Sequence, residues 1–288
     1  MLKNTFCHLP GFGTKLESYL WKNGILSWDE IIDGDALPLK KKAHSLKEGI
    51  RESFRHLGEQ DSAYFARLLP VGAHWRIFRE FREQCAYLDI ETNGIMGDRG
   101  YITTIALFDG RSVSYYLKDR NLKDFKNDIK KYKLLVTYNG KSFDLPIIES
   151  QFKIKLKHAH IDLRHLLNGL GFSGGLKKCE KTLGIDRQEL SGLDGYFAVL
   201  LWNDFLRNRN YKAVETLLAY NIQDAVNLEH LMVAAYNLKL RETPFSSTHE
   251  LALPSPPELP FKADTPTIKR VLSKNYWYSS KLKDYVRT

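Results

Sequence analysis

Residues 86–94 read Ala-Tyr-Leu-Asp-Ile-Glu-Thr-Asn-Gly, and the interpretation of the chain starts from this stretch. Its first half is apolar and aromatic, which is typical of a buried strand. Side chains two residues apart on a strand share one face, so we expect Asp89 and Glu91 to point the same way. Two like charges held together raise each other's pKa unless a cation lies between them, and hard divalent ions are the usual solution. The stretch therefore predicts the floor of a metal-dependent phosphoryl-transfer site, provided that the chain supplies more acids, because Asp-x-Glu alone is common by chance.

A third carboxylate follows a second predicted buried strand. Residues 134–138 read Leu-Leu-Val-Thr-Tyr, and Asn139-Gly140 breaks this strand. Asp144 comes next, just before a helix that begins near Pro146, because proline is tolerated in the first turn of a helix. Asp144 is thus the second acidic site at the C-terminal end of a predicted strand.

The fourth carboxylate lies on a long helix predicted over 211–240. Tyr220 and Asp224 are four residues apart there and share one face. An Asp inside a well-packed helix is unfavourable unless it is paired, exposed or bound to a ligand. Four acids in one cleft would repel strongly, and two divalent ions about 4 Å apart would neutralise them and clamp the oxygens of a phosphodiester.

The remaining elements are predicted from local periodicity and turn residues. Asp109-Gly110 marks a hairpin between two β-rich runs. Residues 153–157 alternate and fit either a loop or an edge strand. The predicted strands beside the hairpin are 101–108 and 112–117, and the predicted helices are 121–132, 176–184 and 196–208.

Composition limits the class of protein. With 288 residues, 43% of them hydrophobic and 12% aromatic, the chain has room for one large or two small domains with a proper core. Its formal net charge of +9 suits a polyanionic partner such as nucleic acid, although charge also serves solubility.

The cysteines and the lengths of the apolar runs predict the cellular compartment of the protein. Cys7, Cys85 and Cys179 are few and far apart, which supports neither a disulfide framework nor a cysteine zinc site. Reduced cysteines are the default in the cytosol. No apolar run approaches the roughly 18 residues of a membrane span, and the first residues lack the apolar core of a secretory signal. We therefore expect a cytoplasmic protein without a membrane partner.

The N-terminal region contains a candidate phosphate-binding turn. Residues 9–13, Leu-Pro-Gly-Phe-Gly, resemble the hairpin of helix-hairpin-helix modules, in which backbone N–H groups hold a nucleic-acid phosphate. Too few residues precede Leu9 for a full first helix, so a tight turn before a packed helix is the alternative. Gly11 and Gly13 are assigned to nucleic-acid contact on this basis. In the basic-aromatic segment 74–84, we expect the aromatic rings in the core and arginines that could line a groove.

Two segments of the sequence each allow two interpretations. His158, His160, Asp162 and His165 lie close in sequence, but no partner set supports zinc. The alternative for Asp162 is that it orients the backbone at a strand-to-helix junction. After Arg241 the prolines, serines and threonines predict an extended linker. The basic and aromatic end that follows either wraps back on the core or stacks on bases.

The three acidic motifs together resemble those of a known family. Asp89-x-Glu91, Asn139-Gly140-x-x-Phe143-Asp144 and Tyr220-x-x-x-Asp224 match in order the motifs of the DEDD 3′→5′ exonucleases. Tyr220 places the chain with the Tyr-containing (DEDDy) branch, since the His branch would need histidine at Ala219. The overall layout most resembles the YprB-like exonucleases of bacteria. The resemblance is strong over 85–240, weaker over 1–84 and absent after 241.

The resemblance implies a fold and a domain division. The fold is α/β, a ribonuclease H-like mixed five-stranded sheet with helices on both faces, and its first three strands form an antiparallel meander. This exonuclease domain would span 81–240. A small helical region, 1–80, would precede it, and a Pro-rich linker with a basic-aromatic tail, 241–288, would follow.

The resemblance also implies a mechanism. Two Mg²⁺ or Mn²⁺ ions would lie between the acids: Asp89 would bridge both, Glu91 and Asp224 would complete the first site, and Asp144 would support the second, largely through water. Tyr220 would orient the attacking water, and nucleoside 5′-monophosphates would be released from a nucleic acid, with a single-stranded 3′ end as the expected substrate. Residues of the second motif are assigned to nucleic-acid contact, namely Asn139, Lys141 and Phe143.

Three other classes remain open at this point. A nucleic-acid-binding module could keep the fold without cleaving, although the full set of acids argues against it. A structure-specific endonuclease of the same fold would differ by releasing oligonucleotides. A two-carboxylate glycosidase is more remote, because it would need neither the additional acids nor a basic surface.

Overall fold

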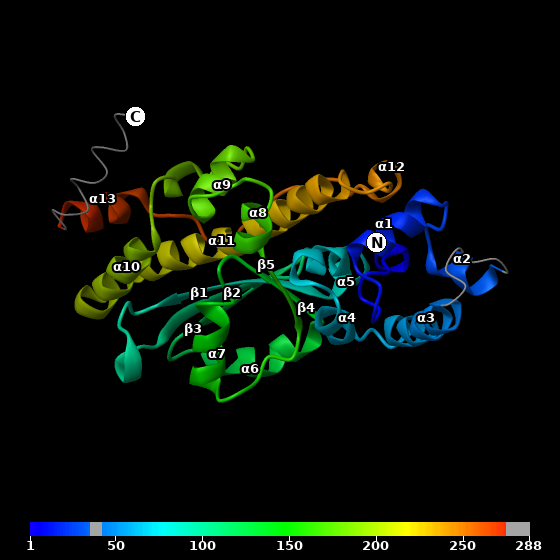
Figure 1. Cartoon of the computed structure of the whole chain (residues 1–288). Helices are drawn as coiled ribbons and strands as arrows, with labels where there is room; N and C mark the ends of the chain where they lie inside the picture. The colour runs from blue at the N-terminus through cyan, green and yellow to red at the C-terminus, as the bar shows by residue number, and fades with distance from the viewer. Residues whose placement is uncertain (35–41, 275–288) are drawn as a thin grey trace.

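A mixed five-stranded sheet forms the centre of the molecule (Figure 1). The computed structural model describes residues 1–34 and 42–274. The strand order is β3-β2-β1-β4-β5, in which β1 pairs antiparallel with β2 and parallel with β4. The pairs β2–β3 and β4–β5 are antiparallel and parallel, respectively. The expected ribonuclease H-like sheet with its antiparallel meander is therefore confirmed. The strands are β1 (Cys85–Thr92), β2 (Ile102–Phe108), β3 (Val113–Leu117), β4 (Leu134–Thr137) and β5 (Ala159–Asp162).

Helices cover both faces of this sheet (Figure 1). The apolar side chains of β1 alternate, so that Tyr87 packs in the larger core under α11 while Leu88 and Ile90 pack in the smaller core with α6 and α7. Within the described ranges, none of the helices is long and apolar enough to cross a membrane. The helices are α1 (Thr14–Lys22), α2 (Trp28–Asp33), α3 (Ala43–Gly58), α4 (Ser62–Leu68), α5 (Phe78–Phe81), α6 (Phe125–Asp128), α7 (Asp144–Phe152), α8 (Leu163–Asn168), α9 (Leu176–Thr182), α10 (Gly195–Asn208), α11 (Tyr211–Leu240), α12 (Ser246–His249) and α13 (Thr265–Ser273).

One local prediction differs from the structure, and of the two alternatives for residues 153–157 the structure has the loop. The helix expected over 121–132 is broken, because α6 covers only Phe125–Asp128 and lies between the 3₁₀ turns Leu122–Asp124 and Ile129–Lys131. The Asn121 side chain bonds the backbone of β3, where it accepts from the Leu117 N–H and donates to the Tyr115 carbonyl oxygen, and Asn and Asp have a low preference for helix interiors. Residues 153–157 form a loop, and the fifth strand begins after them at Ala159.

A buried ion pair fastens the N-terminal helices to the segment before β1. Glu17 is 1% exposed, and its carboxylate accepts hydrogen bonds from the Phe6 and Cys7 backbone N–H groups and from Arg76 Nη1. Arg82 is paired in the same way with Glu229 of α11. These two arginines therefore do not line a groove, contrary to expectation. The aromatic residues of 74–84 are buried as expected, and the Trp75 ring lies 5.5 Å from that of Tyr236.

The described part of the C-terminal region lies against α10 and α11. After α12 the chain is extended, and the Phe261 ring packs edge-on against Tyr115 of β3 at 5.0 Å. The Asp264 N–H donates to Thr216 Oγ1, and Arg270 of α13 pairs with Asp204 of α10. The Pro-rich segment thus crosses the domain surface, and α13 packs on the core. The aromatic residues 276–278 of the expected tail lie outside the described residues.

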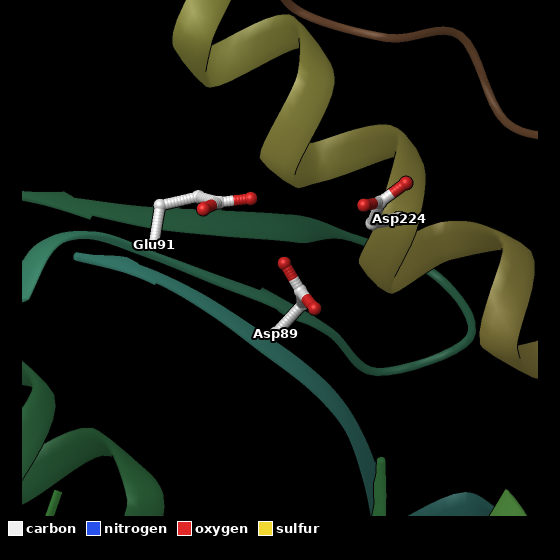
Figure 2. Close-up of side chains that lie close together, drawn as sticks. All are labelled: Asp89, Glu91 and Asp224. Atoms are coloured by element: carbon white, nitrogen blue, oxygen red, sulfur yellow. The ribbon is translucent and has the colours of Figure 1, made fainter. Parts of the chain in front are cut away.

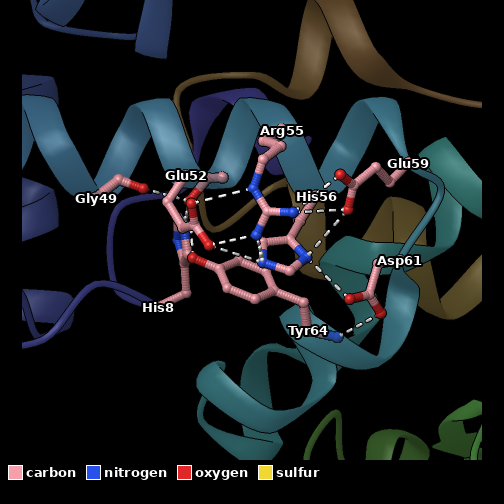
Figure 3. Close-up of polar contacts among 9 residues, drawn as sticks. His8, Gly49, Glu52, Arg55, His56, Glu59, Asp61 and Tyr64 are labelled. Atoms are coloured by element: carbon pink, nitrogen blue, oxygen red, sulfur yellow. Dashed lines mark hydrogen bonds and ion pairs between the residues drawn. The ribbon is translucent and has the colours of Figure 1, made fainter.

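His8 is buried where α3 and α4 meet the N-terminal turn. It is 2% exposed and packs against the rings of Trp28 and Phe65, and its Nε2 is 2.8 Å from Ser53 Oγ. Figure 3 shows His8 beside the polar network in which His56 of α3 stacks on Tyr64 of α4. Burial, followed by the positive charge of Arg76, lowers the pKa of His8 to about 3. His8 is therefore neutral in the folded protein at neutral pH.

This buried histidine predicts a loss of stability in acid. The unfolded chain takes up a proton at His8 near pH 6.5, whereas the folded chain does so only near pH 3, so stability falls as the pH drops through this window. Between pH 7 and pH 5 the contribution is about 2 kcal/mol. Urea unfolding at both pH values should show that His8→Gln loses less stability than the unsubstituted protein. Equal losses in the two proteins would contradict the assignment.

Candidate active site

Three carboxylates converge between β1 and α11. Asp89 and Glu91 point from one face of β1 toward Asp224 on α11 (Figure 2), and one oxygen of each lies within 4.8 Å of the others. The two-residue spacing puts both strand acids on the face that also carries Tyr87 and packs under α11. The structure thus brings together three of the four acids singled out from the sequence, and in the described part of the chain they are the one such group that could hold a metal ion.

The three acids differ in their electrostatic setting. Burial raises the pKa of Asp89 and of Glu91 well above the usual range, and the charge of Asp224 raises both further. Burial alone would do the same to Asp224, but the positive charges of Arg187 and Lys177 hold its pKa below the usual value. The two strand acids are therefore only partly compensated by positive charge, whereas the carboxylate on α11 is well compensated.

Asp144 lies directly beside this group but is held by the backbone. It is 4% exposed, and its Oδ1 accepts a hydrogen bond from the N–H of Ile90, the residue between the two strand acids. Burial raises the pKa of Asp144 to about 7, while the hydrogen bonds from its own N–H and that of Ile90 act in the opposite direction. Its charge also contributes to the raised pKa of Asp89, which shows that the two carboxylates are electrostatically close.

The turn after β4 is what places Asp144 there. Gly140 donates its N–H to Thr137 Oγ1, and a Cβ at this position would lie 2.2 Å from that oxygen. Only glycine permits so close an approach. Asp162, at the end of β5, accepts hydrogen bonds from the N–H groups of Asn139 and Lys141. Asp162 therefore orients backbone at a strand-to-helix junction, as one reading of the sequence held.

Tyr220 lies one helical turn before Asp224 and is 1% exposed. Lys177 Nζ and the Arg187 guanidinium carbon lie 4.5 and 5.5 Å from the centre of its ring. Burial raises the Tyr220 pKa well above the usual value, and the charges of Asp224, Glu91 and Asp89 add to this effect. Its hydroxyl therefore stays protonated and can donate a hydrogen bond next to the acids.

Four polar residues of the site were not predicted from the sequence. Asn221 Nδ2 donates to Asp89 Oδ2 at 2.6 Å. Lys177 and Arg187 bind Asp224, and Glu180 binds Arg187. The Asn next to Tyr220 was a detectable signal, because a polar residue in a packed helix needs a partner. No local spacing rule connects Lys177 with Asp224, which lies 47 residues further along the chain.

The residues assigned to nucleic-acid contact lie in two places. Lys141 and Phe143 are exposed in the loop that leads to Asp144, with Phe143 39% exposed. Asn139 lies at the start of this loop, where its side-chain oxygen accepts a hydrogen bond from Arg164. Gly11 and Gly13 precede α1, which Figure 1 places beside α12 near the C-terminal end of α11, apart from the acid cluster.

The histidines near β5 do not form a metal site. His160 Nε2 is 2.9 Å from Thr137 Oγ1, and His158 Nε2 is 3.0 Å from the Ile129 carbonyl oxygen. Among the described residues they belong to no group of ligands that could hold an ion. The zinc alternative is therefore not supported.

A cavity of about 760 Å³ adjoins the cluster without containing it. The loop 184–190, one face of α11 and the extended segment 254–263 line this cavity. Arg187 lines it as well, and the same guanidinium binds Asp224. Arg187 thus separates the cavity from the acids.

Comparisons with known proteins place the chain in a family. A model of the RNase_H superfamily matches residues 86–236, which contain all five strands except the first residue of β1, the four acids and Tyr220. No curated protein matches the sequence. Among solved structures, the family B DNA polymerase from the hyperthermophilic archaeon Pyrobaculum calidifontis is similar at 16% identity with a TM-score of 0.41. That similarity covers 55% of this chain and 24% of the polymerase chain, so it spans about a quarter of the polymerase. On the family match over about half of its length, the chain belongs to the RNase_H superfamily.

Proposed function

We propose that this chain is a metal-dependent 3′→5′ exonuclease that hydrolyses nucleic-acid phosphodiesters and releases nucleoside 5′-monophosphates. The observation that carries the proposal is the convergence of Asp89, Glu91 and Asp224, with Tyr220 one turn before Asp224. Membership of the RNase_H superfamily supports a nuclease. The order of the motifs supports the DEDDy branch and, within it, the YprB-like exonucleases.

The donor set fits two Mg²⁺ or Mn²⁺ ions. All four side chains offer hard oxygen ligands. Burial and the charge of Asp224 raise the pKa values of Asp89 and Glu91, and bound cations would stabilise the ionised forms of both acids. Asp89 would contact both ions, Glu91 and Asp224 would complete the first site, and Asp144 would support the second, largely through water. When bound, such ions generate a nucleophile from water and stabilise the attacking and leaving oxygens of the phosphodiester.

The protein's own groups would keep this arrangement in place. Asn221 holds Oδ2 of Asp89 and so fixes the orientation of that carboxylate. Arg187 holds Asp224 ionised. The protonated Tyr220 hydroxyl would donate a hydrogen bond that orients the attacking water, which is a positioning role.

A single-stranded 3′ end is the proposed substrate. Lys141 and Phe143 are exposed in the loop just before Asp144, where an ammonium group can bind a phosphate and a ring can stack on a base. Gly11 and Gly13 would contact the phosphate backbone further from the acids. The net charge of +9 favours such a polyanion. The cytoplasmic location remains a prediction.

The proposal is tested by direct cleavage. A 5′-labelled single-stranded DNA and its RNA counterpart are incubated with the protein and Mg²⁺ or Mn²⁺. A ladder that shortens from the 3′ end supports the exonuclease and identifies the sugar preference. Internal oligonucleotide products would indicate an endonuclease, and an intact strand that still binds would indicate a non-cleaving module.

Neutralising Asp89 or Asp224 should abolish cleavage without unfolding the protein. Asp89→Asn and Asp224→Asn should each lower the rate of nucleotide release at least about 100-fold, because each removes a charge that holds a metal ion. Asp119→Asn, an exposed acid after β3, is the matched control and should keep the full rate. Residual activity above a few per cent in either site variant would contradict the site assignment.

Loss of the tyrosine hydroxyl should separate catalysis from metal binding. Tyr220→Phe keeps the ring beneath Lys177 and Arg187 but removes the proposed water-orienting donor. The single-turnover rate should fall about 100-fold, while Mn²⁺ affinity measured by calorimetry should stay unchanged. An unchanged rate would exclude the positioning role of the hydroxyl.

Binding of single-stranded nucleic acid should weaken as salt rises. Affinity is measured over a salt series with Ca²⁺ in place of the catalytic ions. Lys141→Ala should reduce the slope of log affinity against log salt by about 1, because one phosphate contact is lost. Lys126→Ala removes an exposed lysine of α6 on the other face of the sheet and should leave the slope unchanged. Equal effects of the two substitutions would contradict the placement of the strand near Lys141.

A further inference from the structure

Two cations reach the acid cluster from one short part of the chain. Lys177 lies in the first turn of α9, and Arg187 lies in the loop that follows that helix. Lys177 Nζ donates to Asp224 Oδ1, and Arg187 Nη2 lies 2.5 Å from the same oxygen. Both groups also lie over the ring of Tyr220. Two positively charged groups thus contact one oxygen of Asp224, a proposed metal ligand.

Arg187 is fixed in this position by a buried network. Its side chain is 5% exposed, and its Nη1 donates to both carboxylate oxygens of Glu180 at 2.8 and 2.9 Å. Glu180 is fully buried and also accepts a hydrogen bond from Asn227 Nδ2 of α11. Movement of Arg187 would leave Glu180 buried without its charge partner, which is strongly unfavourable. Arg187 is therefore a permanent part of the site.

Lys177 is held much more weakly. Its side chain is 30% exposed, and among the described contacts its ammonium has one hydrogen-bond acceptor, Asp224. The ammonium group sits on a flexible four-carbon stem, and water can replace the contact when the group leaves. Partly exposed ion pairs of this kind contribute little to stability, because water screens them and the lysine side chain loses freedom in forming them.

The charge balance indicates which cation is surplus. Asp89, Glu91, Asp144, Asp224 and the adjoining Glu180 carry five negative charges when ionised. Two divalent ions and Arg187 supply five positive charges, so the site is neutral without Lys177. With Lys177 still on Asp224 the site would carry one positive charge too many in a low-dielectric setting, which is unfavourable.

We propose that Lys177 and a divalent cation compete for Asp224, so that metal binding proceeds by exchange with the Lys177 ammonium. This inference rests on the proposed function, because it uses the same metal site. Before metal binds, Lys177 neutralises part of the acid cluster. After the exchange its ammonium lies at the rim of the site. A lysine that only fastens α9 to α11 would not affect metal affinity in this way.

Metal affinity gives the decisive measurement. Mn²⁺ binding is measured by calorimetry, without nucleic acid, for the unsubstituted protein, Lys177→Met, Lys177→Arg and Lys178→Met. Lys177→Met removes the competing charge and should bind Mn²⁺ about 5- to 10-fold more tightly. Its melting temperature should be lower without metal and should rise more on addition of Mn²⁺. Lys177→Arg keeps a positive charge, and its guanidinium can bind a carboxylate through two hydrogen bonds. This variant should therefore bind Mn²⁺ no more tightly than the unsubstituted protein.

The control variant at Lys178 and the possible outcomes distinguish the proposed metal site from the proposed exchange with Lys177. Lys178 is the exposed neighbour on α9, so Lys178→Met makes the same change in net charge outside the cluster. If Lys177→Met binds Mn²⁺ with unchanged or weaker affinity, or if Lys178→Met tightens binding equally, the exchange is overturned while the metal site stands. If the unsubstituted protein binds no Mn²⁺, the metal site itself is overturned, and the exchange falls with it.

Discussion

The repulsion between carboxylates at the end of β1 is the constraint on which the rest of this structure depends. Asp89 and Glu91 share one face of the strand, and that face packs under α11. The strand cannot turn these side chains to solvent without also exposing Tyr87, which is fully buried on the same face. The acids must therefore be tolerated in place, and the surrounding elements supply what they need. Asn221 donates to Asp89, the Ile90 N–H fixes Asp144, and cations from α9 and its loop balance Asp224.

The long helix α11 serves two purposes along one face. That face carries Tyr220 and Asp224 over the sheet and, one turn further on, Asn227, which supports the Glu180–Arg187 pair. A helix of thirty residues spans about 45 Å, so it also extends beyond the acids to the N-terminal helices. The site is thus built on a strand and a long helix, and regular elements favour a fixed geometry for its carboxylates.

Local patterns were sufficient to predict the parts of the structure that are specified locally. The strands and α11 follow hydrophobic periodicity, and the acidic motifs lie where strand ends and helix faces put them. The break in the 121–132 helix was not predicted because its apolar residues keep the helical period through the two 3₁₀ turns. Lys177, Glu180 and Arg187 were missed for another reason. Their partners are set by how α9 folds over α11, and this depends on tertiary packing that no spacing in the sequence encodes. Arg76 and Arg82 were misplaced for the same reason, since the acids that bury them come from α1 and α11.

The contact between Trp75 and Tyr236 has a consequence for how the protein is made. The two rings lie 5.5 Å apart, yet one residue precedes the first strand and the other lies near the end of α11. On the ribosome, the aromatic side chains around Trp75 emerge long before the helix that covers them. They remain without their native partner until the whole sheet and α11 have been synthesised. Contacts of such long range slow folding and expose apolar surface in the meantime. The nascent chain is therefore most vulnerable to aggregation during the interval between synthesis of its first and last thirds.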